Sequence, residues 1–97
     1  ASRFYHAQIL IELAIRESNQ QQSAADLTEA DKELDRAWEI SDKRMNAVYL
    51  QRARIHRKRG DKEASARDLE NYLKAEPDAK NGAAIRAEIA KLRGATQ

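Results

Sequence analysis

Apolar residues recur every three to four positions along most of the chain, and this period is typical of amphipathic helices. The first such segment runs from Arg3 to about Glu17, and its apolar side chains fall on more than one helical face. A helix of this kind needs neighbours on two sides. The side chains concerned are Phe4, Tyr5, Ile9, Leu10, Ile11, Leu13 and Ile15.

A polar run from Ser18 to Ser23 follows this helix and is typical of a loop, which we place at about residues 18–27. Thr28, with Asp31 three residues later, has the pattern of an N-cap, so a second helix is predicted from there to about Ser41. The pattern therefore predicts a first helical hairpin over about residues 3–41, with an inserted loop between its two helices.

A second hairpin is predicted over about residues 44–76. Gly60 and Asp61 separate its helices, because Gly adopts the left-handed conformation that ends a helix and Asp caps the next one. Pro77 cannot continue the second of these helices, and it also restricts the residue before it. A last helix over about residues 80–93 is apolar on one side and suits a terminal cap.

The composition supports a single all-α domain of about five helices over residues 1–97. One Pro and three Gly are present, whereas Ala, Leu, Glu, Lys and Arg are abundant, and these residues favour helices over hairpin turns. No segment reaches the roughly 20 apolar residues that a membrane span requires, so we expect a soluble chain. The absence of Cys excludes disulfides and thiolate sites. Because the chain starts at Ala1 without Met, we expect it to be part of a longer protein.

The second and fourth predicted helices have similar patterns when they are compared at an offset of 35 residues. A period of about 34 residues is a signature of stacked helical hairpins. The matched pairs are Ala30 with Ser65, Leu34 with Leu69, Ala37 with Tyr72 and Trp38 with Leu73.

The stretch from Tyr49 to Pro77 resembles one tetratricopeptide repeat. It has large aromatic, small, turn, large apolar and closing proline residues in the order of that repeat, namely Tyr49, Ala53, Gly60, Asp61, Ser65, Leu69, Tyr72 and Pro77. The segment from Tyr72 to Leu92 is similar to the final repeat and capping helix of bacterial tetratricopeptide proteins.

This resemblance implies antiparallel hairpins in a right-handed superhelix whose groove binds a peptide or a partner protein. The first helix of each hairpin lines the groove in that family, which implies that Leu50, Arg54, Arg57 and Lys58 lie on or near it. The family's carboxylate clamp uses Lys and Asn at positions that here hold Leu50 and Arg54, so only general peptide binding is expected.

Charge is unevenly distributed along the chain. The segment from Lys43 to Lys62 has a net charge of +7, whereas the remainder sums to −5. The basic helix favours an acidic peptide ligand, because guanidinium groups bind carboxylates in a bidentate manner. Two other interpretations are open. These cations can form a solvated face that suits the helix dipole, or they can contact the phosphates of a nucleic acid.

The residues offer little support for catalysis. His6 and His56 are 50 residues apart and have no second ligand at a metal-binding spacing, so we expect no metal site and no cofactor. Acidic pairs such as Asp31 with Glu33 are expected to be solvated, to cap helices or to pair with Lys and Arg. We therefore predict an interaction module and no enzyme. Because the first helix is apolar on several faces, we expect it to self-associate or to stack on an upstream repeat.

Overall fold

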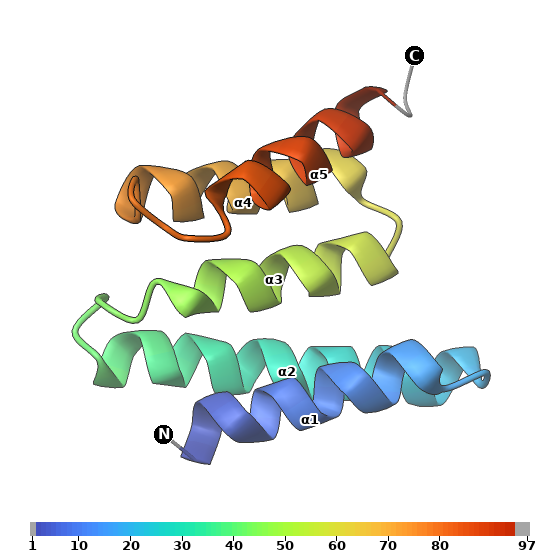
Figure 1. Cartoon of the computed structure of the whole chain (residues 1–97). Coiled ribbons are helices and arrows are strands. Elements are labelled where there is room, and N and C mark those ends of the chain that lie inside the picture. Colours follow the sequence, from blue (N-terminus) through green and yellow to red (C-terminus); the bar gives the residue numbers. More distant parts are fainter. Residues whose placement is uncertain (1, 95–97) are drawn as a thin grey trace.

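The computed structural model describes residues 2–94, which form five α-helices and confirm the all-α prediction: α1 (Ser2–Arg16), α2 (Gln20–Ile40), α3 (Ala47–Lys58), α4 (Lys62–Ala75) and α5 (Gly82–Gly94). Neighbouring helices pack as antiparallel pairs, with α1 in front of α2, α5 in front of α4, and α3 between the two pairs (Figure 1). The principal extents of 35 × 32 × 17 Å correspond to a slab about two helices thick.

The inserted loop predicted at residues 18–27 is wrong. The connection spans only Glu17–Asn19, and α2 begins at Gln20 because the Asn19 side chain accepts a hydrogen bond from the backbone N–H of Gln22. Thr28 is consequently not an N-cap but lies inside α2, where its hydroxyl donates to the carbonyl of Ala24. The glutamine run that was interpreted as a loop has good helix propensity once Asn19 caps it.

The predicted turn between α3 and α4 is confirmed. Gly60 has a φ of +86°, and the N–H groups of Gly60 and Asp61 donate to the carbonyls of Arg57 and His56. This is the Schellman arrangement that ends a helix. The α2 helix ends in the same way without a glycine, since Asp42 has a φ of +59° and donates to the carbonyl of Glu39.

Replacing Asp61 with Ala is expected to lower the free energy of unfolding by about 1 kcal/mol, because the Asp61 carboxylate caps α4 by accepting from the N–H of Ala64. The measurement is urea unfolding followed by circular dichroism. Asp78→Ala is the matched control, since Asp78 is exposed in the α4–α5 linker. Equal losses in the two variants would contradict the capping role.

Two groups of buried side chains stabilise the slab, and α3 contributes to both. The first lies between α1, α2 and α3 and includes Ile11, Leu34, Val48 and Ile55, each at most 1% exposed. The second lies between α3, α4 and α5 and consists of Ala53, Ala66, Leu69, Ile85 and Leu92. Helix α3 therefore packs one apolar side against α1 and α2 and another against α4 and α5.

The two hairpins are built around the same buried contact. The Ser23 hydroxyl of α2 donates to the carbonyl of Ala14 at 2.9 Å, and the Ser65 hydroxyl of α4 donates to the carbonyl of Ala53 at 2.8 Å. Each serine follows the N-cap of its helix, Asn19 or Asp61, by four residues. Ser23 is thus the counterpart of Ser65, at an offset of 42 residues.

The predicted pairing of Ala30 with Ser65 at an offset of 35 residues is therefore wrong by seven positions. Seven residues are about two helical turns, so a shift of this size leaves every apolar residue on the same face. The hydrophobic pattern could not distinguish the two offsets. The extra length lies at the C-terminal end of α2, which has 21 residues against 14 in α4.

The remaining positions of the predicted repeat have structural roles. The Tyr49 ring packs edge-on against Trp38 with a centroid distance of 5.3 Å, and so joins α3 to α2. Leu69 and Tyr72 belong to the second core group, which Tyr49 does not join. Pro77 lies just after the end of α4, as predicted.

Candidate functional site

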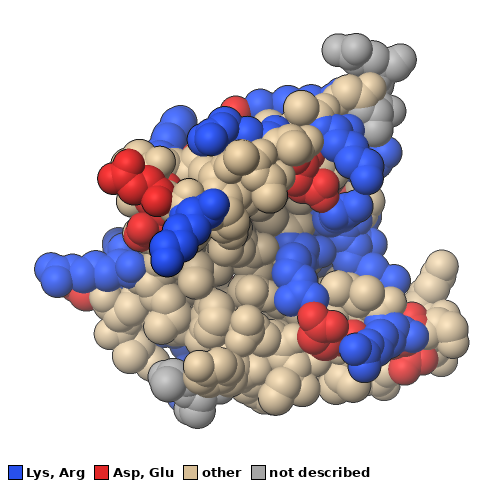
Figure 2. All heavy atoms as spheres, in the orientation of Figure 1, with Lys and Arg blue, Asp and Glu red and all other residues tan. Residues whose placement is uncertain are grey.

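The candidate site is a hollow between the end of α1 and the last turns of α3. Its volume is about 420 Å³, and its lining residues are Ile15, Arg54, Arg57 and Lys58. A second hollow of about 240 Å³ shares Arg57 and extends to Lys62, Glu88, Lys91 and Leu92. We call these two hollows together the α3 groove. Figure 2 shows the recess at the right of the front face, with Lys and Arg side chains inside it.

Two arginines of the groove are already paired within the protein. Arg54 donates to the Glu12 carboxylate of α1 and, at 3.0 Å, to the side chain of Gln51. Arg57 donates to the Glu88 carboxylate of α5. The hydrogen bond from Arg54 holds the pKa of Glu12 below its usual value, so Glu12 remains ionised. Both arginines therefore join helices across the groove.

Other basic side chains of α3, and Arg59 directly after it, also lie close to carboxylates of neighbouring helices. Arg52 donates to Asp35 of α2, Arg59 lies 3.4 Å from Asp31 of α2, and His56 lies 3.4 Å from Asp68 of α4. With the two arginines of the groove, the α3 segment reaches a carboxylate on each of the other four helices. The basic run is therefore largely a set of internal ion pairs, and Asp31 is one of the carboxylates for which pairing with Lys or Arg was expected.

The candidate residues from the sequence divide into three kinds. Arg54 and Arg57 line the groove with their charges paired, whereas Lys58 forms no ion pair with any residue between positions 2 and 94. Leu50 packs against the second core group and is not among the residues that line the two hollows. Ile15 was missed, although its place in an all-round apolar helix was the signal for it.

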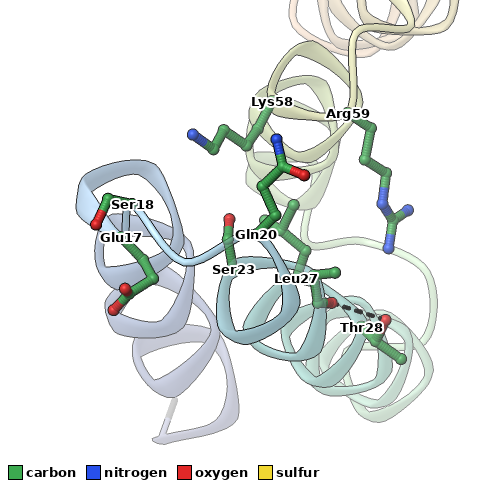
Figure 3. Close-up of a pocket in the computed structure, with 9 residues that line it drawn as sticks. Glu17, Ser18, Gln20, Ser23, Leu27, Thr28, Lys58 and Arg59 are labelled. Carbon is green, nitrogen blue, oxygen red and sulfur yellow. Dashed lines mark hydrogen bonds between the residues drawn. The ribbon is translucent and has the colours of Figure 1, made fainter.

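A separate polar pocket of about 470 Å³ adjoins the groove at Lys58 and lies where the α1–α2 turn meets the end of α3. Figure 3 shows Gln20 and Ser23 on α2 pointing toward the end of α3, with Lys58 and Arg59 on the opposite side. The Ser23 hydroxyl already donates a hydrogen bond to the backbone carbonyl of Ala14, and Arg59 is paired with Asp31. Lys58 is thus the cation common to this pocket and the α3 groove.

Comparison with protein-family models, curated proteins and solved structures finds no match. The tetratricopeptide resemblance therefore depends on the sequence pattern alone and stays a prediction. Between residues 2 and 94, no group of three or more His, Cys, Asp or Glu side chains is placed to hold a metal ion. In the same range, no helix has the length and apolar content that a membrane span needs.

Asp68 of α4, which faces His56 of α3, is an unusual carboxylate. Its Oδ2 atom is buried and, among the described residues, accepts no hydrogen bond, although His56 lies 3.4 Å away. Burial raises the pKa of Asp68 despite the attraction of His56 and Arg52. The ionised form of Asp68 therefore lowers stability relative to the protonated form.

Replacing Asp68 with Asn is expected to raise the thermal midpoint at about pH 7, because the amide removes a buried charge. The sign follows from the raised pKa. The stabilisation from protonated Asp68 is complete below the unfolded pKa of 3.8 and is lost as the pH rises through the folded pKa. The gain in Asp68→Asn should therefore vanish in acid, when measured by thermal unfolding at several pH values. The exposed Asp78→Asn is the control, and an Asp68→Asn variant that loses stability at neutral pH would contradict this account.

Proposed function

We propose that this protein is an interaction module of the tetratricopeptide kind, which binds an extended peptide segment of a partner protein in the α3 groove. The observation that supports this most directly is the hollow that combines Ile15 with Arg54, Arg57 and Lys58. It places an apolar side chain beside cations from another helix, and such a combination suits a peptide with alternating apolar and acidic groups.

The arrangement of the hairpins supports the comparison with that family. Helix α3 contacts both α1 and α2, so the second hairpin stacks on the first through its leading helix. The small residues Ala53 and Ser65 allow α3 and α4 to approach closely, as the repeat requires. A right-handed superhelix with the α3 groove on its inner face is the architecture that we propose.

The ligand preference depends on which cations are available. Glu12 and Glu88 already neutralise Arg54 and Arg57, so an incoming carboxylate has to displace those pairs or bind elsewhere. Lys58, Lys62 and Lys91 line the groove and form no ion pair within residues 2–94. We therefore assign the acidic preference chiefly to Lys58, which stands beside Ile15.

The internal ion pairs weigh against the alternative of a nucleic-acid-binding domain. A protein that binds phosphates in this way depends on unpaired Lys and Arg, because affinity follows the counterions released. Four arginines of the basic segment are instead paired with carboxylates on neighbouring helices: Arg52, Arg54, Arg57 and Arg59.

The experiment that tests the proposal is fluorescence anisotropy with three labelled probes. These are a peptide of alternating Leu and Glu, the same peptide with Gln in place of Glu, and a single-stranded RNA. The Glu peptide is expected to bind most tightly, and Lys58→Glu is expected to weaken it about tenfold or more, since a charge-assisted contact contributes roughly 1.5–3 kcal/mol.

Lys80→Glu is the matched control, because Lys80 is exposed in the α4–α5 linker and changes the net charge equally. Equal weakening by both variants would show that only net charge matters and would contradict the groove. Preferential binding of RNA with a steep salt dependence would replace the proposal with the nucleic-acid alternative.

A further inference from the structure

The α3 groove has a carboxylate on each of its two walls. On one wall, Glu12 of α1 lies in a hollow of about 480 Å³ that shares Arg54 with the groove and is also lined by Arg16. On the other wall, Glu88 of α5 lies among the three cations of the 240 Å³ hollow. Figure 2 shows acidic side chains on both sides of the Lys and Arg side chains in the recess. Each wall therefore presents one carboxylate to the cations of α3.

No carboxylate from residues 2–94 lines the hollow between these two walls, where Ile15 lies beside three cations. Two of these cations, Arg54 and Arg57, are three residues apart and so lie on the same side of α3. They nevertheless pair in opposite directions, Arg54 with α1 and Arg57 with α5. An acidic side chain that enters the central hollow therefore meets two guanidinium groups whose present partners stand at the edges of the same space.

The hydrogen bonds of Arg54 show which atom an incoming carboxylate would compete for. The Nη1 atom donates to the side chain of Gln51, whereas Nη2 donates to the Glu12 carboxylate. Gln51 is buried, so it can hold the guanidinium group in place while Nη2 changes partner. The Glu12 side chain is 49% exposed and the Arg57 side chain is 57% exposed. Exchanging either partner therefore requires side-chain motion near the surface and leaves the apolar core intact.

We propose that Glu12 and Glu88 are internal competitors for the acidic side chains of a bound peptide, and that they hold the α3 groove in a self-inhibited state. This inference rests on the proposed function. The two carboxylates occupy the arginines before a ligand arrives, so the ligand has to break each pair that it replaces, and the free energy of that pair is subtracted from its affinity. A peptide that also places an apolar side chain against Ile15 can offset this cost, which a lone carboxylate cannot.

The alternative is that the two ion pairs only brace the helices around the groove. Removing either carboxylate would then loosen a wall of the groove, so the affinity for an acidic peptide would stay the same or fall. Internal competition predicts the opposite direction, because the freed arginine becomes available to the ligand. The sign of the change in affinity therefore distinguishes the two roles.

The test measures fluorescence anisotropy on the full chain with Glu12→Gln, Glu88→Gln and the double variant, using the Leu–Glu peptide and its Gln counterpart. Each single variant is expected to bind the Glu peptide about two- to fivefold more tightly, since this is the range that an exposed ion pair supports. The double variant should combine the two effects, because the two carboxylates lie on different helices and have different partners. The affinity for the Gln peptide should not change.

Glu29→Gln is the matched control, because Glu29 is exposed on α2 and its substitution changes the net charge equally. Equal tightening by this control would show that only net charge matters and would overturn the inference. An unchanged or weaker affinity for the Glu peptide in both single variants, while Lys58→Glu still weakens binding, would overturn the inference and leave the proposed function standing. A Glu peptide that binds neither the unsubstituted protein nor any variant at low salt would overturn both.

Discussion

Replacing Ile11 with Ala is expected to lower the free energy of unfolding by about 2–5 kcal/mol. Ile11 is fully buried in the first core group, between Ala7 and Ala14 on α1 and the apolar side of α2. Its truncation removes apolar contacts and leaves a cavity that the stiff helix pair can close only in part. A chain of this size has only about 5–15 kcal/mol of net stability, so much of the population would unfold on mild heating.

Ile9→Ala is the internal control for this prediction, because the same substitution is made two positions away on the same helix. Ile9 is 57% exposed, and its truncation should change the free energy of unfolding by about 0.5 kcal/mol or less. Urea unfolding of both variants, followed by circular dichroism, measures the difference directly. Similar losses in the two variants would show that α1 does not bury the face described above.

Replacing either buried serine with Leu is expected to cost about 1–3 kcal/mol or more, because the larger side chain forces two closely packed helices apart. Ser65 is 1% exposed and Ser23 is 6% exposed, and each donates to a carbonyl of the preceding helix. Each variant also loses this buried hydrogen bond, which adds about 0.5–1.5 kcal/mol. Thermal or urea unfolding of the two variants would measure the loss.

Ser18→Leu provides the matched control, since Ser18 is exposed in the α1–α2 turn and should tolerate Leu with little change. The prediction also tests the structural repeat. If Ser23 and Ser65 are counterparts, their Ser→Ala variants should lose similar amounts of stability. A Ser23→Ala variant that is fully neutral, beside a costly Ser65→Ala, would show that the hairpins share a pattern but not this contact.

Much of the fold was predictable because local physics determines it. The apolar period placed four of the five helix starts within a few residues, and Gly60 with Asp61 located the α3–α4 turn. The start of α2 was missed because Asn19 was not recognised as the cap, and a glutamine run is compatible with either a loop or a helix. The offset between hairpins was missed because two helical turns preserve the apolar face.

The candidate site was predictable only in part. The family resemblance implied that Arg54, Arg57 and Lys58 lie on or near a groove, and in the structure these three side chains line one hollow. The sequence could not predict that the charges of Arg54 and Arg57 are paired within the protein. The partners of Arg54 and Arg57 are Glu12 and Glu88, which are 42 and 31 residues away along the chain. Ile15 enters the groove for the same reason, because α1 and α3 become neighbours only when the hairpins stack.

The sequence alone determined the all-α class, most helix bounds and the Gly60–Asp61 turn, because each depends on interactions within a few residues. Only the tertiary structure decided that the arginines of the basic segment pair with carboxylates on α1, α2 and α5, and that Lys58 stays unpaired among the residues it describes. The physical reason is the distance along the chain over which each kind of interaction acts. Caps and helical periods act within one or two turns, whereas ion pairs and hollows depend on how separate helices are brought together.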